Sequence, residues 1–304
     1  LDMENHISGS WTLDKYEVKP FVSLLKEFSI LEVKGEDAEV FLHGQFTNHI
    51  KNLGESFRLA AYCQPQGRIL ALMRVVKYND AYLLILPTDL VAGFFKRLSM
   101  FILRSKVTIR EAQELSVYGL IDPDIAPPEI DHAVLTDGYL ICRVSDWNNK
   151  ARVMVVGDAQ TLSERFTGVT DDAALWFKSE IESGTPWVFE KTKEAFIPQW
   201  INLDKIGGLV FDKGCYPGQE IISRVQHIGS TPRRMIVLKS NDSVTVLANT
   251  DIFQANQAVG NVVMSVNSSA ETVVLAEVSL KSMEGGTYQI NGVSFSMSTL
   301  PYSI

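Results

Sequence analysis

Short apolar runs bounded by turn residues dominate the first third of the chain, a pattern typical of β-strands in an α+β fold. Strands are predicted at residues 28–33, 58–63, 68–77, 81–86 and 106–110. Between them, residues 36–43 have helical spacing and are followed by Gly44, a residue type that often ends helices. A longer helix is predicted over residues 89–103, with Thr88 as its N-cap.

The middle of the chain continues this mixture, and the last part differs from it. Strands are predicted at residues 115–121, 139–144 and 152–156, and helices at 158–166 and 171–182. After Thr231-Pro232 short strands alternate with turn signals, as in a small β-barrel. These strands are predicted at residues 235–238, 244–248, 260–265 and 272–278, with a hairpin turn at 291–292. The prediction is an α+β segment 1–113, a second α+β segment 114–230 and a C-terminal β-barrel 231–304.

Composition places the chain among globular proteins with a substantial core, since 46% of its 304 residues are hydrophobic and 21% are charged. No apolar run approaches the roughly 20 residues that span a bilayer, and the acidic start does not resemble a secretory signal. The net charge of −8 disfavours tight non-specific RNA binding, because Lys and Arg contacts to phosphate dominate that affinity. We therefore expect no membrane contact, and only an indirect contact with any tRNA.

The cysteines and histidines exclude several kinds of site. Cys63, Cys142 and Cys215 are far apart and show no Cys-x-x-Cys spacing, which indicates reduced thiols in a cytoplasmic protein. The five histidines include no pair three or four residues apart, so no metal site is predicted. An iron–sulfur cluster held by this chain alone would lack ligands.

The run Lys213-Gly214-Cys215-Tyr216-Pro217-Gly218-Gln219-Glu220 is the most informative stretch of the chain. Pro217 is expected to open a helix in which Glu220 and Arg224 lie four residues apart. A cysteine just before a helix N-terminus, with Lys213 nearby, is expected to have a lowered thiol pKa and to form a thiolate. The alternative is a small apolar cysteine that packs at a tight turn, and the residues alone leave both interpretations open.

This motif, followed by Ser223-Arg224, resembles the signature of the YgfZ family, folate-binding proteins linked to tRNA modification and to the maintenance of iron–sulfur enzymes. Further segments that resemble the family are found at residues 33–38, 45–47, 62–68, 105–109, 196–199, 202–203, 207–208 and 300–303. The resemblance implies antiparallel sheets with flanking helices around a central folate channel, plus the C-terminal β-barrel. It also implies tetrahydrofolate or a folate derivative as the cofactor.

The wider superfamily includes the glycine-cleavage T-protein, an aminomethyltransferase whose catalytic aspartate follows a Gly-rich hairpin turn. The matching place in this chain is occupied by Ala71 and Leu72. Neither side chain can accept a proton or stabilise a developing iminium. The departure argues against aminomethyl transfer, although not against folate binding.

Three residues are the candidates for folate contact that the resemblance implies. Glu182 matches a folate-binding glutamate, and a carboxylate can accept two N–H groups of a pterin. Trp176 matches a tryptophan associated with folate, and its indole can stack on a flat ring. Phe28 stands where the family has a second aromatic residue, a tryptophan. The alternatives are a solvated surface glutamate for Glu182 and a core aromatic for Trp176.

The functional expectation is an accessory protein that binds folate and supports iron–sulfur enzymes, including those that methylthiolate tRNA. Cys215 and Lys213 are the candidates for its reactive site, and Lys213 is expected to hold a thiolate or to meet the glutamate tail of the ligand. The alternative is a folate-dependent one-carbon transferase. No acid–base pair is visible beside the motif, which favours the accessory role.

Overall fold

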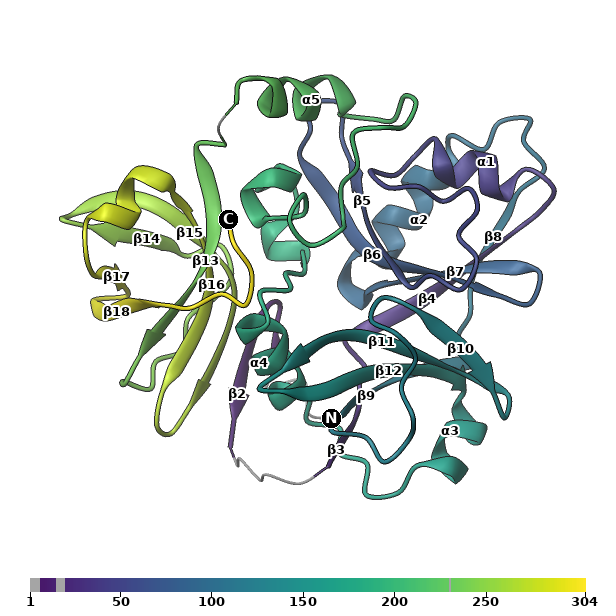
Figure 1. The fold of residues 1–304 in the computed structure, drawn as a ribbon, viewed down its shortest axis with the longest axis horizontal. Coiled ribbons are helices and arrows are strands. Elements are labelled where there is room, and N and C mark those ends of the chain that lie inside the picture. The colour runs from purple at the N-terminus through teal and green to yellow at the C-terminus, as the bar shows by residue number, and fades with distance from the viewer. Residues whose placement is uncertain (1–5, 15–19, 230) are drawn as a thin grey trace.

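The computed structural model describes residues 6–14, 20–229 and 231–304, and its strands form three β-sheets (Figure 1). Neighbouring strands are antiparallel in nearly every pair. Helices flank the first two sheets, and the third sheet closes on itself as a barrel. The predicted α+β class with a C-terminal barrel is therefore confirmed.

The first sheet comes from the part of the chain whose strands were predicted most closely. Its strands, in spatial order, are β5 (Arg58–Cys63), β6 (Ile69–Tyr78), β7 (Ala81–Pro87), β4 (Phe28–Lys34) and β8 (Thr108–Glu111). Every residue of β7 and the first eight of β6 are buried, which explains why these strands are continuous apolar runs. Helices α1 (Ala38–His43) and α2 (Val91–Ser99) accompany this sheet.

Helix α2 is shorter than predicted at both ends. A single 3₁₀ turn, η1 (Thr88–Leu90), precedes it, and the Thr88 side chain does not cap it. After Ser99 the chain tightens into bonds between residues three apart, such as Phe101 N–H to Leu98 O at 3.1 Å. Leu103 then takes a left-handed backbone with φ of 49°, which a right-handed helix cannot contain.

The second sheet contains β10 (Ala133–Thr136), β11 (Tyr139–Trp147), β12 (Lys150–Asp158), β9 (Leu115–Ile121) and β3 (Phe21–Leu24), in that order. Helix α3 (Ala159–Arg165) follows directly, and the Asp158 carboxylate caps it by accepting hydrogen bonds from the N–H groups of Gln160 and Thr161. Helix α4 (Ala174–Glu182) contacts both β9 and β11. The second sheet therefore packs against one side of α4.

Six strands close the barrel: β13 (Arg233–Ser240), β14 (Asp251–Gln254), β15 (Gln257–Ser268), β16 (Thr272–Ser279), β17 (Tyr288–Ile290) and β18 (Val293–Ser298). The ring closes because β15 pairs with both β14 and β16. A short 3₁₀ helix, η4 (Leu280–Glu284), connects β16 to β17. Asn291 and Gly292 both have positive φ and form the predicted β17–β18 turn.

The strand predicted at residues 244–248 is wrong. Backbone groups of this stretch bond to side chains instead of a neighbouring strand: the Thr272 hydroxyl accepts from Val244 N–H, and the Ser265 hydroxyl donates to Val246 O. Val246 is nevertheless fully buried. The apolar pattern was therefore correct about burial and misleading about the backbone.

The N-terminal residues join sheets that are distant in sequence. Strand β1 (His6–Ile7) pairs with β2 (Ser10–Leu13), and β2 runs parallel to β15 of the barrel. The predicted segment 1–113 thus contributes strands to all three sheets. That segments 1–113, 114–230 and 231–304 are separate folding units stays a prediction.

Helix α4 and the segment after it lie at the centre of the molecule (Figure 1). Besides the second sheet, α4 contacts β2, β15 and β16. Two 3₁₀ helices, η2 (Glu190–Thr192) and η3 (Pro198–Ile201), then lead to the loop before α5 (Gln219–His227). Within the described ranges, no helix has the length and apolar character needed to cross a membrane.

Candidate functional site

Cys215 lies on an exposed loop, residues 210–218, that leads from the centre of the molecule to α5. Its side chain is exposed, whereas Cys63 and Cys142 are buried. Burial raises the pKa of both buried thiols, which keeps them in the unreactive thiol form. Cys63 and Cys142 are therefore packing residues, and Cys215 is the accessible thiol.

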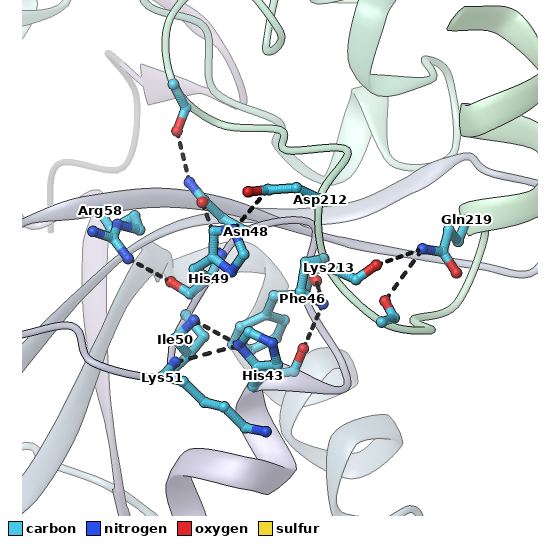
Figure 2. Close-up of polar contacts among 12 residues, drawn as sticks. His43, Phe46, Asn48, His49, Ile50, Lys51, Arg58, Asp212, Lys213 and Gln219 are labelled. Carbon is cyan, nitrogen blue, oxygen red and sulfur yellow. Dashed lines mark hydrogen bonds and ion pairs between the residues drawn. The ribbon is translucent and has the colours of Figure 1, made fainter. Parts of the chain in front are cut away.

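Lys213 fixes this loop to helix α1 and the residues that follow it. Its Nζ donates hydrogen bonds to His43 O at 2.6 Å and to Phe46 O at 3.0 Å, at the end of α1 (Figure 2). The same atom lies 4.5 Å from the ring centroid of the buried Tyr216. Burial lowers the pKa of Lys213 to about 8, with Cys215 opposing the shift and Lys51 adding to it. Within the part of the chain that the structure describes, the amine makes no hydrogen bond to the Cys215 sulfur.

Gln219, the first residue of α5, fixes the other side of the loop. Its Nε2 donates to Lys213 O and to Gly214 O, both at 3.2 Å (Figure 2). Two side chains thus close the loop around Cys215, one from before the cysteine and one from after it. Hydrogen bonds on both sides of Cys215 therefore fix the backbone that carries the thiol.

Gly218 allows the Cys215 loop to pack closely against the turn between β5 and β6. It has φ of 86°, and a Cβ added there would meet Gln64 O at 2.8 Å. Gly67 in the facing turn has φ of 82°, and a Cβ there would lie 3.2 Å from Ile221. Glycine is needed at both positions because other residues rarely adopt this backbone and because the two turns approach closely. The prediction that Pro217 opens the helix is wrong: Gly218 is the N-cap, and its left-handed backbone excludes Pro217 from α5.

Two histidines that were not predicted as site residues lie beside the Lys213 side chain. The rings of His43 and His49 stack with centroids 5.6 Å apart, and His49 Nε2 lies 2.8 Å from Asp212 Oδ1 (Figure 2). His43 Nδ1 accepts a hydrogen bond from Ile50 N–H at 3.0 Å. Burial and the neighbouring Lys213 lower the pKa of His43, which favours a neutral ring with its proton on Nε2. The two histidines are six residues apart, so no local spacing revealed the pair.

The three predicted folate residues gather on or against α4. Phe28 begins β4, and its ring lies 5.8 Å from Phe177 of α4 and 4.6 Å from Trp187. Trp176 is fully buried, with the Arg152 guanidinium 5.0 Å from its ring centroid. Its indole Nε1 is buried and has no hydrogen-bond partner among the described residues.

Glu182 ends α4 on the side that faces the barrel. Its carboxylate accepts hydrogen bonds from Lys178 at 2.6 Å and from Lys239 of β13. Lys178 also pairs with Glu271 at 3.3 Å. Burial acts to raise the pKa of Glu182, but the two lysines outweigh it and lower the pKa. The carboxylate is therefore ionised and partly buried, and not the solvated surface group of the alternative.

A buried network of hydrogen bonds around Arg152 and Glu180, next to α4, was not predicted from the sequence. Arg152 of β12 is fully buried, and its guanidinium donates five hydrogen bonds, two of them to Ser145, one to Ser179, one to Ser183 and one to Glu180 at 2.5 Å. The second Glu180 oxygen accepts from Trp187 Nε1 at 2.6 Å. Both charges are therefore paired and hydrogen-bonded, which is what a buried ion pair needs.

A search of residues 6–14, 20–229 and 231–304 finds no group of three or more His, Cys, Asp or Glu side chains that could hold a metal ion. Exposed Cys215, the His43–His49 pair and Asp212 thus lie in one region without forming a cation site. The chemistry that this region offers is that of a single exposed thiol near the partly buried amine of Lys213.

Comparison with curated proteins decides the family. The tRNA-modifying protein YgfZ of Colwellia psychrerythraea is 30% identical over 234 residues, which cover 71% of this chain and 70% of that protein. The chain belongs to the YgfZ family. The YgfZ protein of an Enterobacter species is 26% identical over 301 residues, and the match covers 92% of each chain. No family model matches the chain.

Among solved structures, the glycine cleavage system aminomethyltransferase T from Bartonella henselae has a similar fold. The TM-score is 0.70 over 93% of this chain and 86% of that structure, with 13% sequence identity. At this identity the similarity concerns the fold. It agrees with the antiparallel sheets and barrel described above, and the arrangement of the YgfZ chain is that of the aminomethyltransferase fold.

Proposed function

We propose that this YgfZ chain supports the modification of tRNA as an accessory protein, with Cys215 as its reactive group. The observation that carries the proposal is an exposed thiol on a loop that Lys213 and Gln219 fix from both sides, in a chain whose curated relatives are named tRNA-modifying proteins. An exposed thiol that served only packing would not need such anchoring. In this proposal Lys213 is a positioning residue that acts through the loop.

The thiol acts on a protein partner rather than directly on RNA. The chain carries a net charge of −8, which disfavours extensive phosphate contacts. Iron–sulfur enzymes, including those that methylthiolate tRNA, are the proposed partners. A single thiol without further ligands suits a transient contact with a cluster or with another thiol, and not the permanent holding of a cluster.

Tetrahydrofolate or a related folate is the proposed ligand, and the residues around α4 fit it in part. A carboxylate has about four acceptor positions, so Glu182 can receive N–H groups of a pterin while it keeps both lysine bonds. The buried Nε1–H of Trp176 lacks a partner and can donate to a ring nitrogen or carbonyl. Because Trp176 is fully buried beside Arg152, we assign it this donor role rather than stacking. Phe28 supplies an apolar wall.

Calorimetric titration with tetrahydrofolate tests the ligand proposal. Trp176→Phe removes the indole N–H but keeps an aromatic ring, and Glu182→Gln removes the charge. Each is expected to weaken binding by about tenfold, since a hydrogen bond to a buried or charged group is at stake. Trp200→Phe is the matched control, because Trp200 Nε1 is also buried and lacks a hydrogen-bond partner among the described residues but lies outside α4. The absence of binding heat in the unaltered protein would contradict the ligand proposal.

The second candidate function is folate-dependent one-carbon transfer. The observation that favours it is the similarity in fold to an aminomethyltransferase. Ala71 and Leu72 on β6 are fully buried and apolar, so this stretch offers no carboxylate for aminomethyl transfer. Product analysis after incubation with methylene- or methyl-tetrahydrofolate separates the two functions. An accessory protein returns the folate unchanged, whereas a transferase converts it.

A further inference from the structure

A cleft of about 400 Å³ lies between α2 and the η2 segment, and no residue of the Cys215 loop is among its lining residues. Apolar side chains from β5, β6, η1 and α2 form much of its lining: Tyr62, Leu70, Leu90 and Phe94. Its volume is within the range of small-molecule sites, which are mostly apolar with a few placed polar groups. Phe28, Trp176 and Glu182 do not line this cleft.

A glycine within α2 keeps the cleft open. Gly93 lies in the helix and lines the cleft, and a Cβ added there would meet nothing within 4 Å. Glycine inside a helix costs about 1 kcal/mol relative to alanine. Neither a positive φ nor a close neighbour requires glycine at this position. The residue therefore weakens the helix and leaves space in the cleft.

Three cationic side chains line the cleft. Lys96 and Arg97 of α2 line one side and Lys193 lines the other, and none of the three forms an ion pair with a described residue. Arg97 Nε is buried and has no hydrogen-bond partner among the described residues. The Arg97 guanidinium lies beside the Tyr62 hydroxyl, where it opposes the rise in the Tyr62 pKa that burial causes. A guanidinium with an unused donor in a cleft lined by aromatic side chains suits an anionic group attached to an apolar body.

We propose that this cleft binds an aromatic organic anion, a carboxylate, sulfonate or phosphate, at a site separate from the proposed folate residues. The ring lies on the floor that includes Tyr62 and Phe94, and the anionic group receives hydrogen bonds from Arg97. Glu190 and Glu194 also line the cleft, and they disfavour ligands with several negative charges. The site does not depend on the proposed function of Cys215.

Fluorescence titration with the aromatic anion anilinonaphthalene sulfonate tests the site on the full chain. Gly93→Leu fills the cleft without a backbone clash and is expected to abolish saturable binding. Ala92→Leu is the matched control, since Ala92 is the exposed neighbour on the same helix and does not line the cleft. Arg97→Gln is expected to weaken dye binding by about tenfold. It should leave unchanged the binding of uncharged N-phenylnaphthylamine.

Two results would overturn the proposal. Unchanged dye binding in Gly93→Leu would place the dye elsewhere on the surface. Displacement of the dye from the native protein by tetrahydrofolate would make the cleft part of the folate site. Circular dichroism and thermal unfolding check the fold of each variant, and leucine should raise the helix stability. If Gly93→Leu does not fold, the difference between charged and uncharged dyes in Arg97→Gln decides.

Discussion

The centre of the molecule and the Cys215 loop use a basic side chain in opposite ways. At the centre, Arg152 is fully buried and spends every N–H group on protein acceptors. On the loop, Lys213 uses its amine to hold the backbone while the neighbouring Cys215 stays exposed. The Arg152 guanidinium therefore has no N–H group left to bind a ligand, whereas the Cys215 thiol remains accessible. The fully buried guanidinium is therefore structural, and the exposed thiol on its anchored loop is the proposed reactive group.

Breaking the central network should give the largest effect. Arg152→Met leaves Glu180 buried without its cation, and we expect a loss of about 3–5 kcal/mol in the free energy of unfolding. Urea unfolding followed by tryptophan fluorescence measures it. Replacing Glu180 by leucine as well removes the unpaired charge and should recover much of the loss. A loss below about 1 kcal/mol for Arg152→Met would show that the network is not the structural centre.

The next largest expected effect is a pH-dependent change in the free energy of unfolding, and it comes from a second buried carboxyl group, that of Glu27. Burial, partly offset by Lys26 and the Trp11 indole, raises the pKa of Glu27 from 4.5 to about 7. The folded state therefore holds this proton more tightly than the unfolded state, and the stability it provides below about pH 4.5 is lost as the pH rises through 7.

Glu27→Gln should remove that dependence. We expect a gain of roughly 3 kcal/mol at pH 8 and little change at pH 4, measured as the difference in free energy of unfolding between the two pH values. Parallel stability curves for the variant and the native protein across this range would rule out the raised pKa.

Two glycines of the loop allow a matched comparison of anchoring. Gly218→Ala forces a left-handed backbone on alanine and drives its Cβ toward Gln64 O, so we expect a loss of about 1–3 kcal/mol. Gly214→Ala, four residues earlier, meets nothing within 4 Å and should be close to neutral. Thermal unfolding of both variants measures the difference. Equal midpoints would contradict the close approach of the two turns.

Removing the Lys213 anchor should give a smaller loss of stability and a clear change at the thiol. Lys213→Met leaves the carbonyl oxygens of His43 and Phe46 without their donor, at a cost of about 1 kcal/mol. The rate at which Cys215 reacts with an aromatic disulfide reagent should change because the loop is released. Lys213→Arg can still donate to the two carbonyls and should retain more of the native rate, whereas identical rates in all three proteins would leave Lys213 without a positioning role.

The sequence allowed the local features to be predicted, and long-range contacts decided the others. The strands of the first sheet follow from apolar runs that are buried on both faces, as in β7. A motif of eight residues identified Cys215 as the candidate thiol, but it left open whether the side chain is exposed or packed, and only the structure shows that it is exposed. The partners of Lys213 lie about 170 residues away, so no local pattern could identify them.

Backbone conformation limited the rest of the prediction. Helix α2 ends before Leu103, whose apolar side chain continues the helical pattern although its backbone is left-handed. Residues 244–248 have a strand-like pattern but bond to side chains of Thr272 and Ser265. Arg152 lies within the apolar middle of β12, and its five hydrogen bonds go to Ser145 of β11 and to three residues in or just after α4, all distant in sequence or on another element.

Cys215 itself should contribute least to stability and most to function. Its exposed side chain predicts a change within about 0.5 kcal/mol for Cys215→Ala. The most direct test is the level of tRNA methylthiolation in cells that lack their own YgfZ protein and carry either this chain or the Cys215→Ala variant. The account predicts that the native chain restores the modification and that the stable, folate-binding variant does not. Full restoration by Cys215→Ala would contradict a reactive role for the thiol.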